Sequence, residues 1–130
     1  MENITEQIEL ARMARKNSCC QHSHFSVGTC LTTKNGRKYI GTNIENDGLQ
    51  SICGERCAFC KALSEGEREF ESIVVVAGPE NEDEVKTTPC GYCRQFMNEY
   101  VDKDFKVYCV YGNTVEEYTI EELLPYSFKF

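Results

Sequence analysis

The hydrophobic residues of this chain recur with two periods, one typical of helices and one typical of strands. Between Thr5 and Lys16, apolar residues such as Met13 are spaced about 3.6 residues apart, which predicts an amphipathic helix that Thr5 can cap. Three further helices are predicted, at residues 53–65, 91–101 and 121–124. Gly66 ends the first of these, and Pro125 stops the last.

The segments predicted to be strands are short and rich in β-forming residues. Asn35-Gly36 separates two of them and is a strong hairpin signal. Ser72 to Gly78 is apolar at nearly every position, which is expected of a central strand that is covered on both faces. The predicted strands are residues 26–33, 38–44, 72–78 and 106–111, with a candidate edge strand at 115–119.

The order of these elements indicates an α/β fold. A helix is followed by a hairpin and then by alternating helices and strands, which predicts a three-layer α/β/α arrangement around a mixed five-stranded sheet. The chain has 130 residues and contains neither an internal repeat nor a linker-like tract. We therefore expect one domain over residues 1–130.

The net charge, the acidic first residues and the short apolar runs of the chain exclude several classes of partner. The chain carries 14 basic and 21 acidic residues, a net charge of −7, whereas nucleic-acid binding depends on clustered Lys and Arg. Its first residues are acidic, and its longest apolar run is about five residues, far short of a membrane span. We expect a cytoplasmic protein with reduced thiols, no nucleic-acid partner and no membrane association. The acidic run from Glu80 to Glu84 is expected to be a solvated loop.

Nine cysteines are the unusual feature, and an odd number cannot be fully paired within the chain. A Cys-x-x-Cys pair at a helix start brings two sulfurs within reach of one metal ion, and Cys90 and Cys93 fit this pattern. Cys57 and Cys60 form a second pair, so a four-cysteine structural zinc module is one alternative. These two cysteines would lie inside their helix, however, and about 29 residues separate Cys60 from Cys90, longer than common structural zinc spacings.

We favour Cys53, Cys90 and Cys93 as zinc ligands, because each lies at the start of a predicted helix, where backbone N–H groups favour a thiolate. Three protein ligands leave the fourth tetrahedral position open, as in catalytic zinc sites. Cys57 lies four residues after Cys53 on the same helix face, and its role stays open. The remaining cysteines are expected to be packing residues: Cys19, Cys20, Cys30, Cys60 and Cys109. His22 and His24 lack the spacing of a ligand pair and are expected to be surface or hydrogen-bonding residues.

Two charged residues beside the first ligand suggest catalysis. Glu55 follows Cys53 by two residues, and a carboxylate beside an open metal position can shuttle protons for the reacting water. A Cys-x-Glu followed by a Pro-Cys-x-x-Cys, here beginning at Pro89, matches the pattern of zinc deaminases, in which the Glu is an acid/base and not a ligand. Three thiolates carry −3 against +2 for zinc, and Arg56 can offset this charge by donating hydrogen bonds to the sulfurs.

These motifs resemble those of the small cytidine deaminases that have three cysteine ligands and assemble as homotetramers. The segments that carry the resemblance are Ser23–Gly28, Asn43–Asn46, Cys53–Arg56, Pro89–Gln95 and Leu123–Phe128. The resemblance implies a cytidine deaminase-like fold, one zinc ion per subunit, and hydrolysis of cytidine or deoxycytidine to the uridine product and ammonia in pyrimidine salvage.

The resemblance also implies roles for individual residues. Phe25 would stack on the pyrimidine, and Asn43 and Glu45 would hydrogen-bond the ribose hydroxyls. Phe128 would reach the base in a neighbouring subunit's site, and Glu55 would protonate ring N3 and then the leaving amino group. Without the resemblance, Phe25 would be read as a core residue, and Asn43 and Glu45 as solvated residues on one face of a strand.

The chain departs from the family pattern at several positions. Ser26 replaces the usual Pro, Gly54 the usual Ala and Cys57 the usual Thr, and the loop at 46–52 is shorter and lacks a Tyr. Blasticidin-S deaminases share the catalytic motifs, the shorter loop and the Ser, but they lack a Glu at the position of Glu45, so they are the alternative nearest in chemistry. A non-catalytic zinc-stabilised interaction domain is the alternative of another class, and it would need four cysteines but no Glu55.

Overall fold

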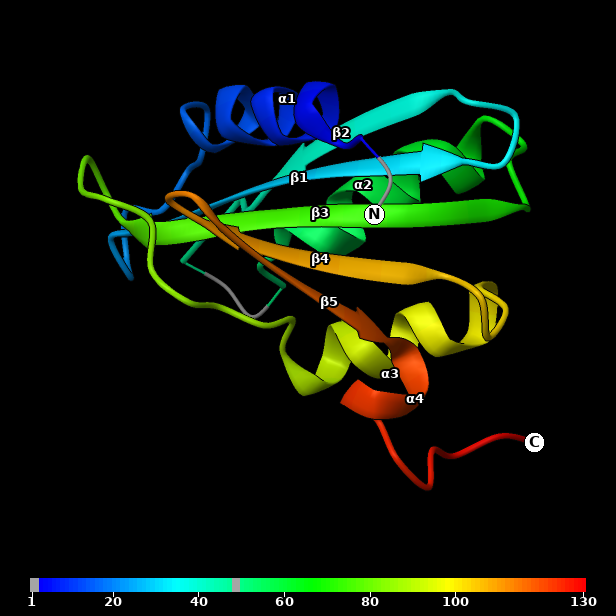
Figure 1. Cartoon of the computed structure of the whole chain (residues 1–130). Helices are drawn as coiled ribbons and strands as arrows, with labels where there is room; N and C mark the ends of the chain where they lie inside the picture. Colours follow the sequence, from blue (N-terminus) through cyan, green and yellow to red (C-terminus); the bar gives the residue numbers. More distant parts are fainter. Residues whose placement is uncertain (1–2, 48–49) are drawn as a thin grey trace.

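A mixed sheet forms the middle layer of the protein (Figure 1). The computed structural model describes residues 3–47 and 50–130, and within them five strands run in the order β2-β1-β3-β4-β5. The strands are β1 (Phe25–Thr33), β2 (Lys38–Thr42), β3 (Phe70–Pro79), β4 (Lys106–Tyr111) and β5 (Thr114–Thr119). The helices are α1 (Thr5–Arg15), α2 (Gly54–Ser64), α3 (Gly91–Tyr100) and α4 (Ile120–Leu123). The predicted three-layer α/β/α class is confirmed, because α1 covers one face and α2 and α3 cover the other.

The strand pairing determines which strands are joined by a hairpin and which need a crossover helix. β1 pairs antiparallel with both β2 and β3, β4 pairs antiparallel with β5, and only β3 and β4 are parallel among the described strands. A parallel pair needs a crossover, which α3 supplies. The hairpin predicted at Asn35-Gly36 joins β1 to β2, and the φ of +89° at Gly36 suits this tight turn. β2 ends at Thr42, two residues before the predicted end at Ile44, which instead forms isolated bridges with Cys19 and Ile52.

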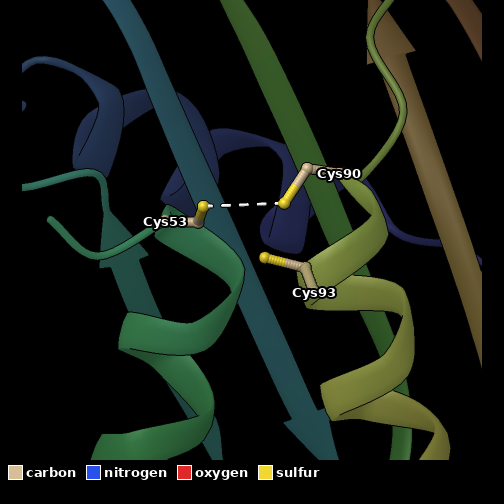
Figure 2. A group of neighbouring side chains, drawn as sticks. All are labelled: Cys53, Cys90 and Cys93. Carbon is tan, nitrogen blue, oxygen red and sulfur yellow. Dashed lines mark hydrogen bonds between the residues drawn. The ribbon is translucent and has the colours of Figure 1, made fainter. Parts of the chain in front are cut away.

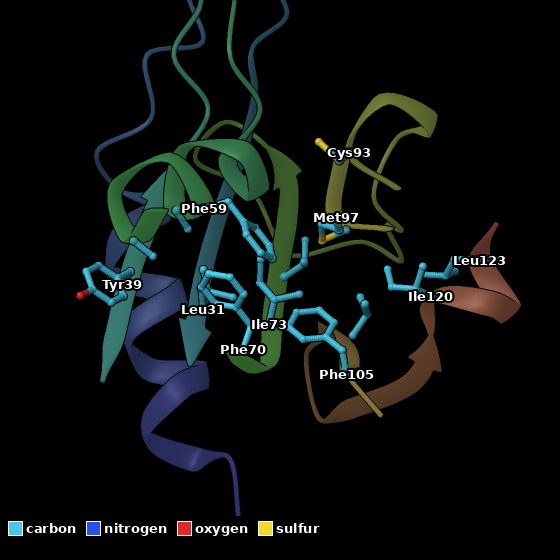
Figure 3. Packing of buried hydrophobic residues seen from close by; sticks show 14 of the residues in the cluster. Leu31, Tyr39, Phe59, Phe70, Ile73, Cys93, Met97, Phe105, Ile120 and Leu123 are labelled. Carbon is cyan, nitrogen blue, oxygen red and sulfur yellow. The ribbon is translucent and has the colours of Figure 1, made fainter. Parts of the chain in front are cut away.

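The face of the sheet under α2 and α3 carries the larger core (Figure 3). Phe59 of α2 is its centre, with ring centroids 5.0 Å from Phe70 and 6.0 Å from Phe105. Met97 of α3 and Ile73 of β3 belong to the same cluster and are fully buried. Burying one such side chain stabilises the fold by about 1.5–3 kcal/mol, so this cluster holds both helices firmly against the strands.

The opposite face is covered by α1 and is packed with smaller side chains. A Cβ on Gly28 would lie 2.0 Å from the backbone oxygen of Ala11, so the helix sits directly on the strand. Two sequence predictions for this helix are wrong. The N-cap is Ile4 and not Thr5, and Met13 is 58% exposed. The close approach to Gly28 explains the second error, because it selects small buried residues such as Ala11 over large ones.

Two further predictions about single side chains need correction. Cys20, Cys30 and Cys109 are buried as expected, but Cys19 and Cys60 are exposed and are not packing residues. The loop from Glu80 is solvated only in part, because the Glu84 carboxylate turns inward and pairs with Arg12 at 2.7 Å. No helix in the described part of the chain is long and apolar enough to span a membrane.

Candidate active site

The first turns of α2 and α3 meet at one end of the sheet and bring three cysteines together (Figure 2). Cys53 is the N-cap of α2, Cys90 is the N-cap of α3, and Cys93 lies in the first turn of α3. Neither N-cap sulfur hydrogen-bonds to its own helix backbone, and the two sulfurs lie 3.8 Å apart between the helices. The positive ends of two helix dipoles therefore act on the same three sulfurs and favour negative charge in the cluster.

The spacing of the sulfurs fits one zinc ion. All three lie within 4.8 Å of one another, and those of Cys53 and Cys90 are 3.8 Å apart. Zn–S bonds of about 2.3 Å in a tetrahedral site place two sulfurs about 3.8 Å apart, so this donor set matches zinc in chemistry and in size. Over residues 3–47 and 50–130, these cysteines are the one group of Cys, His and carboxylate side chains able to share an ion. Cys57 and the exposed Cys60 stand outside it, so a four-cysteine module is not formed.

Arg56 provides positive charge beside the cluster. Its guanidinium donates a hydrogen bond of 3.2 Å to the sulfur of Cys53, as the sequence predicted. Hydrogen bonds from Cys93 and Arg56 lower the pKa of Cys53 to about 5. The pKa of Cys93 is raised, because it keeps its proton in the hydrogen bond to Cys53 and because it is buried. The cluster therefore holds negative charge on the sulfur that Arg56 contacts.

Glu55 lies in the first turn of α2, between Cys53 and Arg56 in the chain, and is only 5% exposed. Burial raises the pKa of its carboxyl to about 7. A group with a pKa near the working pH both gives and accepts protons readily, so Glu55 has the properties of a general acid/base.

A pocket of about 380 Å³ opens in front of the cluster and contains most of the residues that the sequence singled out. It is lined by Ser23, Phe25, Val27, Asn43, Glu45, Ser51, Ile52, Cys53, Glu55, Arg56, Thr87, Thr88 and Cys90. Phe128 does not line it. This residue lies 61% exposed on the C-terminal tail, where its ring packs on Phe130 at 5.0 Å and its carbonyl accepts a hydrogen bond from Gln95.

Asn43 is buried in the wall of this pocket, although its residue type alone predicts a solvated side chain. Its Oδ1 accepts hydrogen bonds from the Val27 N–H at 2.9 Å and the Ser18 hydroxyl at 2.5 Å. Its Nδ2 donates to the Phe25 carbonyl at 2.8 Å. The amide thus fixes the start of β1, and one N–H of its Nδ2 has no acceptor among the residues that the structure describes.

Glu45 holds the turn that precedes Phe25. One carboxylate oxygen accepts from the backbone N–H groups of His22 and Ser23, and the other accepts from the Ser23 hydroxyl at 2.5 Å. The hydrogen bonds from Ser23 lower the pKa of Glu45, so it stays ionised at neutral pH. His22 and His24 contact surface carboxylates, which confirms that they are surface hydrogen-bonding residues.

The sequence reading missed the residues that shape the approach to the pocket. Thr87 and Thr88 line it from the loop between β3 and α3, and Arg94 holds this loop through hydrogen bonds to the Thr88 hydroxyl at 2.8 Å and the Pro89 carbonyl at 2.7 Å. Arg94 also donates to the Leu123 carbonyl at 2.7 Å. Its place directly after Cys93 was the one available signal, and spacing alone does not reveal these partners.

Comparison with known proteins agrees with this geometry. Residues 1–109 match the family model described as the cytidine and deoxycytidylate deaminase zinc-binding region. The chain belongs to this deaminase family. It is 42% identical over 126 residues to a cytidine deaminase of Halalkalibacterium halodurans, covering 93% of this chain and 90% of that protein. A crystal structure of a cytidine deaminase from Burkholderia pseudomallei superposes with a TM-score of 0.86 at 34% identity, covering 98% of this chain and all of that one.

A relative of the second substrate class is also similar. A blasticidin-S deaminase of Bacillus cereus is 30% identical over 134 residues, covering 97% of this chain and 95% of that protein. Both substrate classes are therefore compatible with the fold, with the deaminase family and with a cysteine cluster that fits one zinc ion per subunit. The choice of substrate depends on the pocket.

Proposed function

We propose that this protein is a zinc-dependent hydrolase that deaminates cytidine and deoxycytidine, consuming water and releasing ammonia and the uridine product. The observation that carries the proposal is the position of Glu55, buried beside the three-cysteine cluster and facing the same pocket as Phe25, Asn43 and Glu45. Relatives named cytidine deaminase, matching over nearly the whole chain, support the same chemistry.

Cys53, Cys90 and Cys93 would hold the metal, and zinc bound there would supply a Lewis acid that makes water a nucleophile near neutral pH. Glu55 protonates N3 of the pyrimidine ring, takes a proton from the attacking water and delivers it to the leaving amino group. These transfers balance, because water provides the oxygen of the product, one of its two protons ends on ring N3 and the other leaves with ammonia. The pKa of about 7 at Glu55 supports this role.

Binding of the nucleoside depends on both ends of the pocket. Phe25 stacks on the base. The free N–H of Asn43 donates to a sugar hydroxyl, and the carboxylate of Glu45 accepts from it, which suits a group that is both acceptor and donor. Both side chains are already held by the protein, so little ordering is needed when the sugar binds.

Assembly and location are part of the proposal. Phe128 completes the site of a neighbouring subunit in a homotetramer, which the exposed aromatic tail at Tyr126, Phe128 and Phe130 supports. One deaminase domain over residues 1–130 works in the cytoplasm in pyrimidine salvage. Free thiols such as these ligands stay reduced in the cytosol, which supports this location.

Blasticidin S is the second candidate substrate. Ser26 favours it, because blasticidin-S deaminases carry Ser at the position where cytidine deaminases usually have Pro. The Ser26 side chain is buried, donates to the Gly78 carbonyl at 3.3 Å and accepts from Arg15 at 2.8 Å. It therefore anchors the start of β1 beside Phe25 in a way that proline cannot. Glu45 favours a nucleoside sugar instead.

A substrate panel tests the proposal. Cytidine, deoxycytidine, cytosine and blasticidin S are each incubated with the protein while loss of the amino-cytosine absorbance is followed. We expect turnover of the two nucleosides, and Glu55→Gln is expected to lower it about 10²- to 10⁴-fold with zinc content unchanged. Turnover of blasticidin S alone favours the second substrate. If the zinc-loaded parent deaminates none of the four compounds, the deaminase proposal fails and a non-catalytic zinc domain is favoured.

A further inference from the structure

The aromatic ring of Tyr92 contacts the guanidinium of Arg56, the cationic side chain beside the three cysteines, from outside the pocket. The guanidinium carbon of Arg56 lies 3.9 Å from the ring centroid of Tyr92. Arg56 belongs to the first turn of α2 and Tyr92 to the first turn of α3, so the contact bridges the two helices that carry the cysteines. Tyr92 does not line the pocket, and its 65% exposure shows that only one side of the ring is covered.

The contact occupies a side of Arg56 that hydrogen bonds leave free. An edge N–H of the guanidinium points to the sulfur of Cys53 at 3.2 Å. Its Nε is buried and has no hydrogen-bond partner among the residues that the structure describes. Stacking on an aromatic face uses the flat side of a guanidinium and leaves its edge available, so the ring of Tyr92 can fix the plane in which Arg56 reaches Cys53.

We infer that Tyr92 is a positioning residue, whose ring holds the Arg56 guanidinium on the Cys53 sulfur and so stabilises the metal-loaded three-cysteine site. Three thiolates exceed the charge of zinc by one, and a cation kept against one of them offsets the excess. The ring also shields one face of the cation from water, which strengthens its interaction with the sulfur. This inference rests on the zinc site and deepens the proposed function.

The test measures zinc affinity in the full-length protein by competition with a chromophoric chelator. We expect Tyr92→Leu to raise the zinc dissociation constant about 2- to 30-fold, the factor that a cation–π contact contributes. Tyr92→Phe keeps the ring face and is expected to retain the parent affinity. Tyr100→Leu is the matched control, because Tyr100 lies on the same helix and packs on Phe96 at 5.1 Å.

A double-mutant cycle with Arg56→Gln separates positioning from general packing. If the ring acts through Arg56, then Tyr92→Leu has no further effect on zinc affinity once Arg56 is replaced. Should the Gln variant bind too little zinc to measure, Arg56→Lys takes its place; its ammonium lacks the flat face that stacks on the ring, so the effect of Tyr92→Leu is expected to shrink and not to vanish. In cobalt-substituted protein, the thiolate-to-cobalt absorption band is expected to shift in Tyr92→Leu and to stay unchanged in Tyr100→Leu.

Two results would overturn the inference: unchanged zinc affinity in Tyr92→Leu, or a loss of equal size with and without Arg56. A loss in Tyr92→Phe that matches the loss in Tyr92→Leu also counts against it, because the hydroxyl and not the ring would then be responsible. None of these readouts needs a substrate. Failure of the deaminase proposal, seen as an inactive zinc-loaded parent, is therefore distinguishable from failure of this one.

Discussion

The two faces of the sheet are built in a similar way, yet only one of them carries the site. On each face a helix rests directly on a strand glycine, α1 on Gly28 and α2 on Gly41. The α1 face receives one helix, which packs through small residues. The α2 face receives two helices that begin side by side at the same end of the sheet, so their N-termini act on shared groups. The difference shows that the site depends on where helices begin and not on how tightly they pack.

The glycine pair gives the strongest test of this comparison. A Cβ on Gly41 would lie 2.4 Å from the Gly54 oxygen and 2.6 Å from the Ala58 nitrogen, and one on Gly28 would lie 2.0 Å from the Ala11 oxygen. We expect Gly41→Ala and Gly28→Ala each to lower the free energy of unfolding by about 1–3 kcal/mol or more, measured by urea denaturation. Only Gly41→Ala is expected to weaken zinc binding per folded molecule, since it displaces the first turn of α2. Equal zinc loss in both variants would contradict the division between the faces.

An arginine pair tests the same division with a smaller effect. Arg94 anchors the loop before Cys90, whereas Arg12 on the α1 face binds Glu84 at 2.7 Å and the Gly112 carbonyl at 2.8 Å. We expect Arg94→Ala to cost about 2 kcal/mol of unfolding free energy and to weaken zinc binding, because its hydrogen bonds come from a charged group. Arg12→Ala is expected to cost about 1 kcal/mol, because its side chain is partly exposed, and to leave zinc affinity unchanged. Chelator competition measures the zinc affinity, and urea denaturation measures the free energy of unfolding. Weakened zinc binding in Arg12→Ala would contradict the division between the two faces.

A cysteine pair is expected to show no difference between the faces. Cys30 lies on the α1 side and Cys109 on the α2 side, and both are fully buried. Burial raises the pKa of Cys30 to about 11 and that of Cys109 to about 12, so both remain protonated at pH 8, well below these values. We expect neither to react with a maleimide in the native protein, whereas the exposed Cys19 and Cys60 react, as resolved by peptide mass spectrometry. Rapid native labelling of Cys30 or Cys109 would show that its face opens locally.

Much of the fold and of the metal cluster could be predicted because it depends on local patterns. Helix and strand periods extend over a few residues, and the positions of Cys53, Cys90 and Cys93 follow from where two predicted helices begin. The errors arose where contacts from distant segments decide a side chain's surroundings. Met13 is exposed because the sheet approaches α1 at Gly28. Glu84 turns inward because it pairs with Arg12, a residue 72 positions away in the chain that no local pattern connects to it.

The sequence by itself determined the α/β class, the three cysteines and the neighbouring Glu55 and Arg56, since these depend on spacing within short segments. Only the tertiary structure decided that Asn43 is buried, that Arg94 secures the loop before Cys90 and that Tyr92 lies against Arg56. The physical reason is that a hydrogen bond or a ring contact requires two groups within a few ångströms. For groups on separate elements, that distance is set by how the helices pack on the sheet.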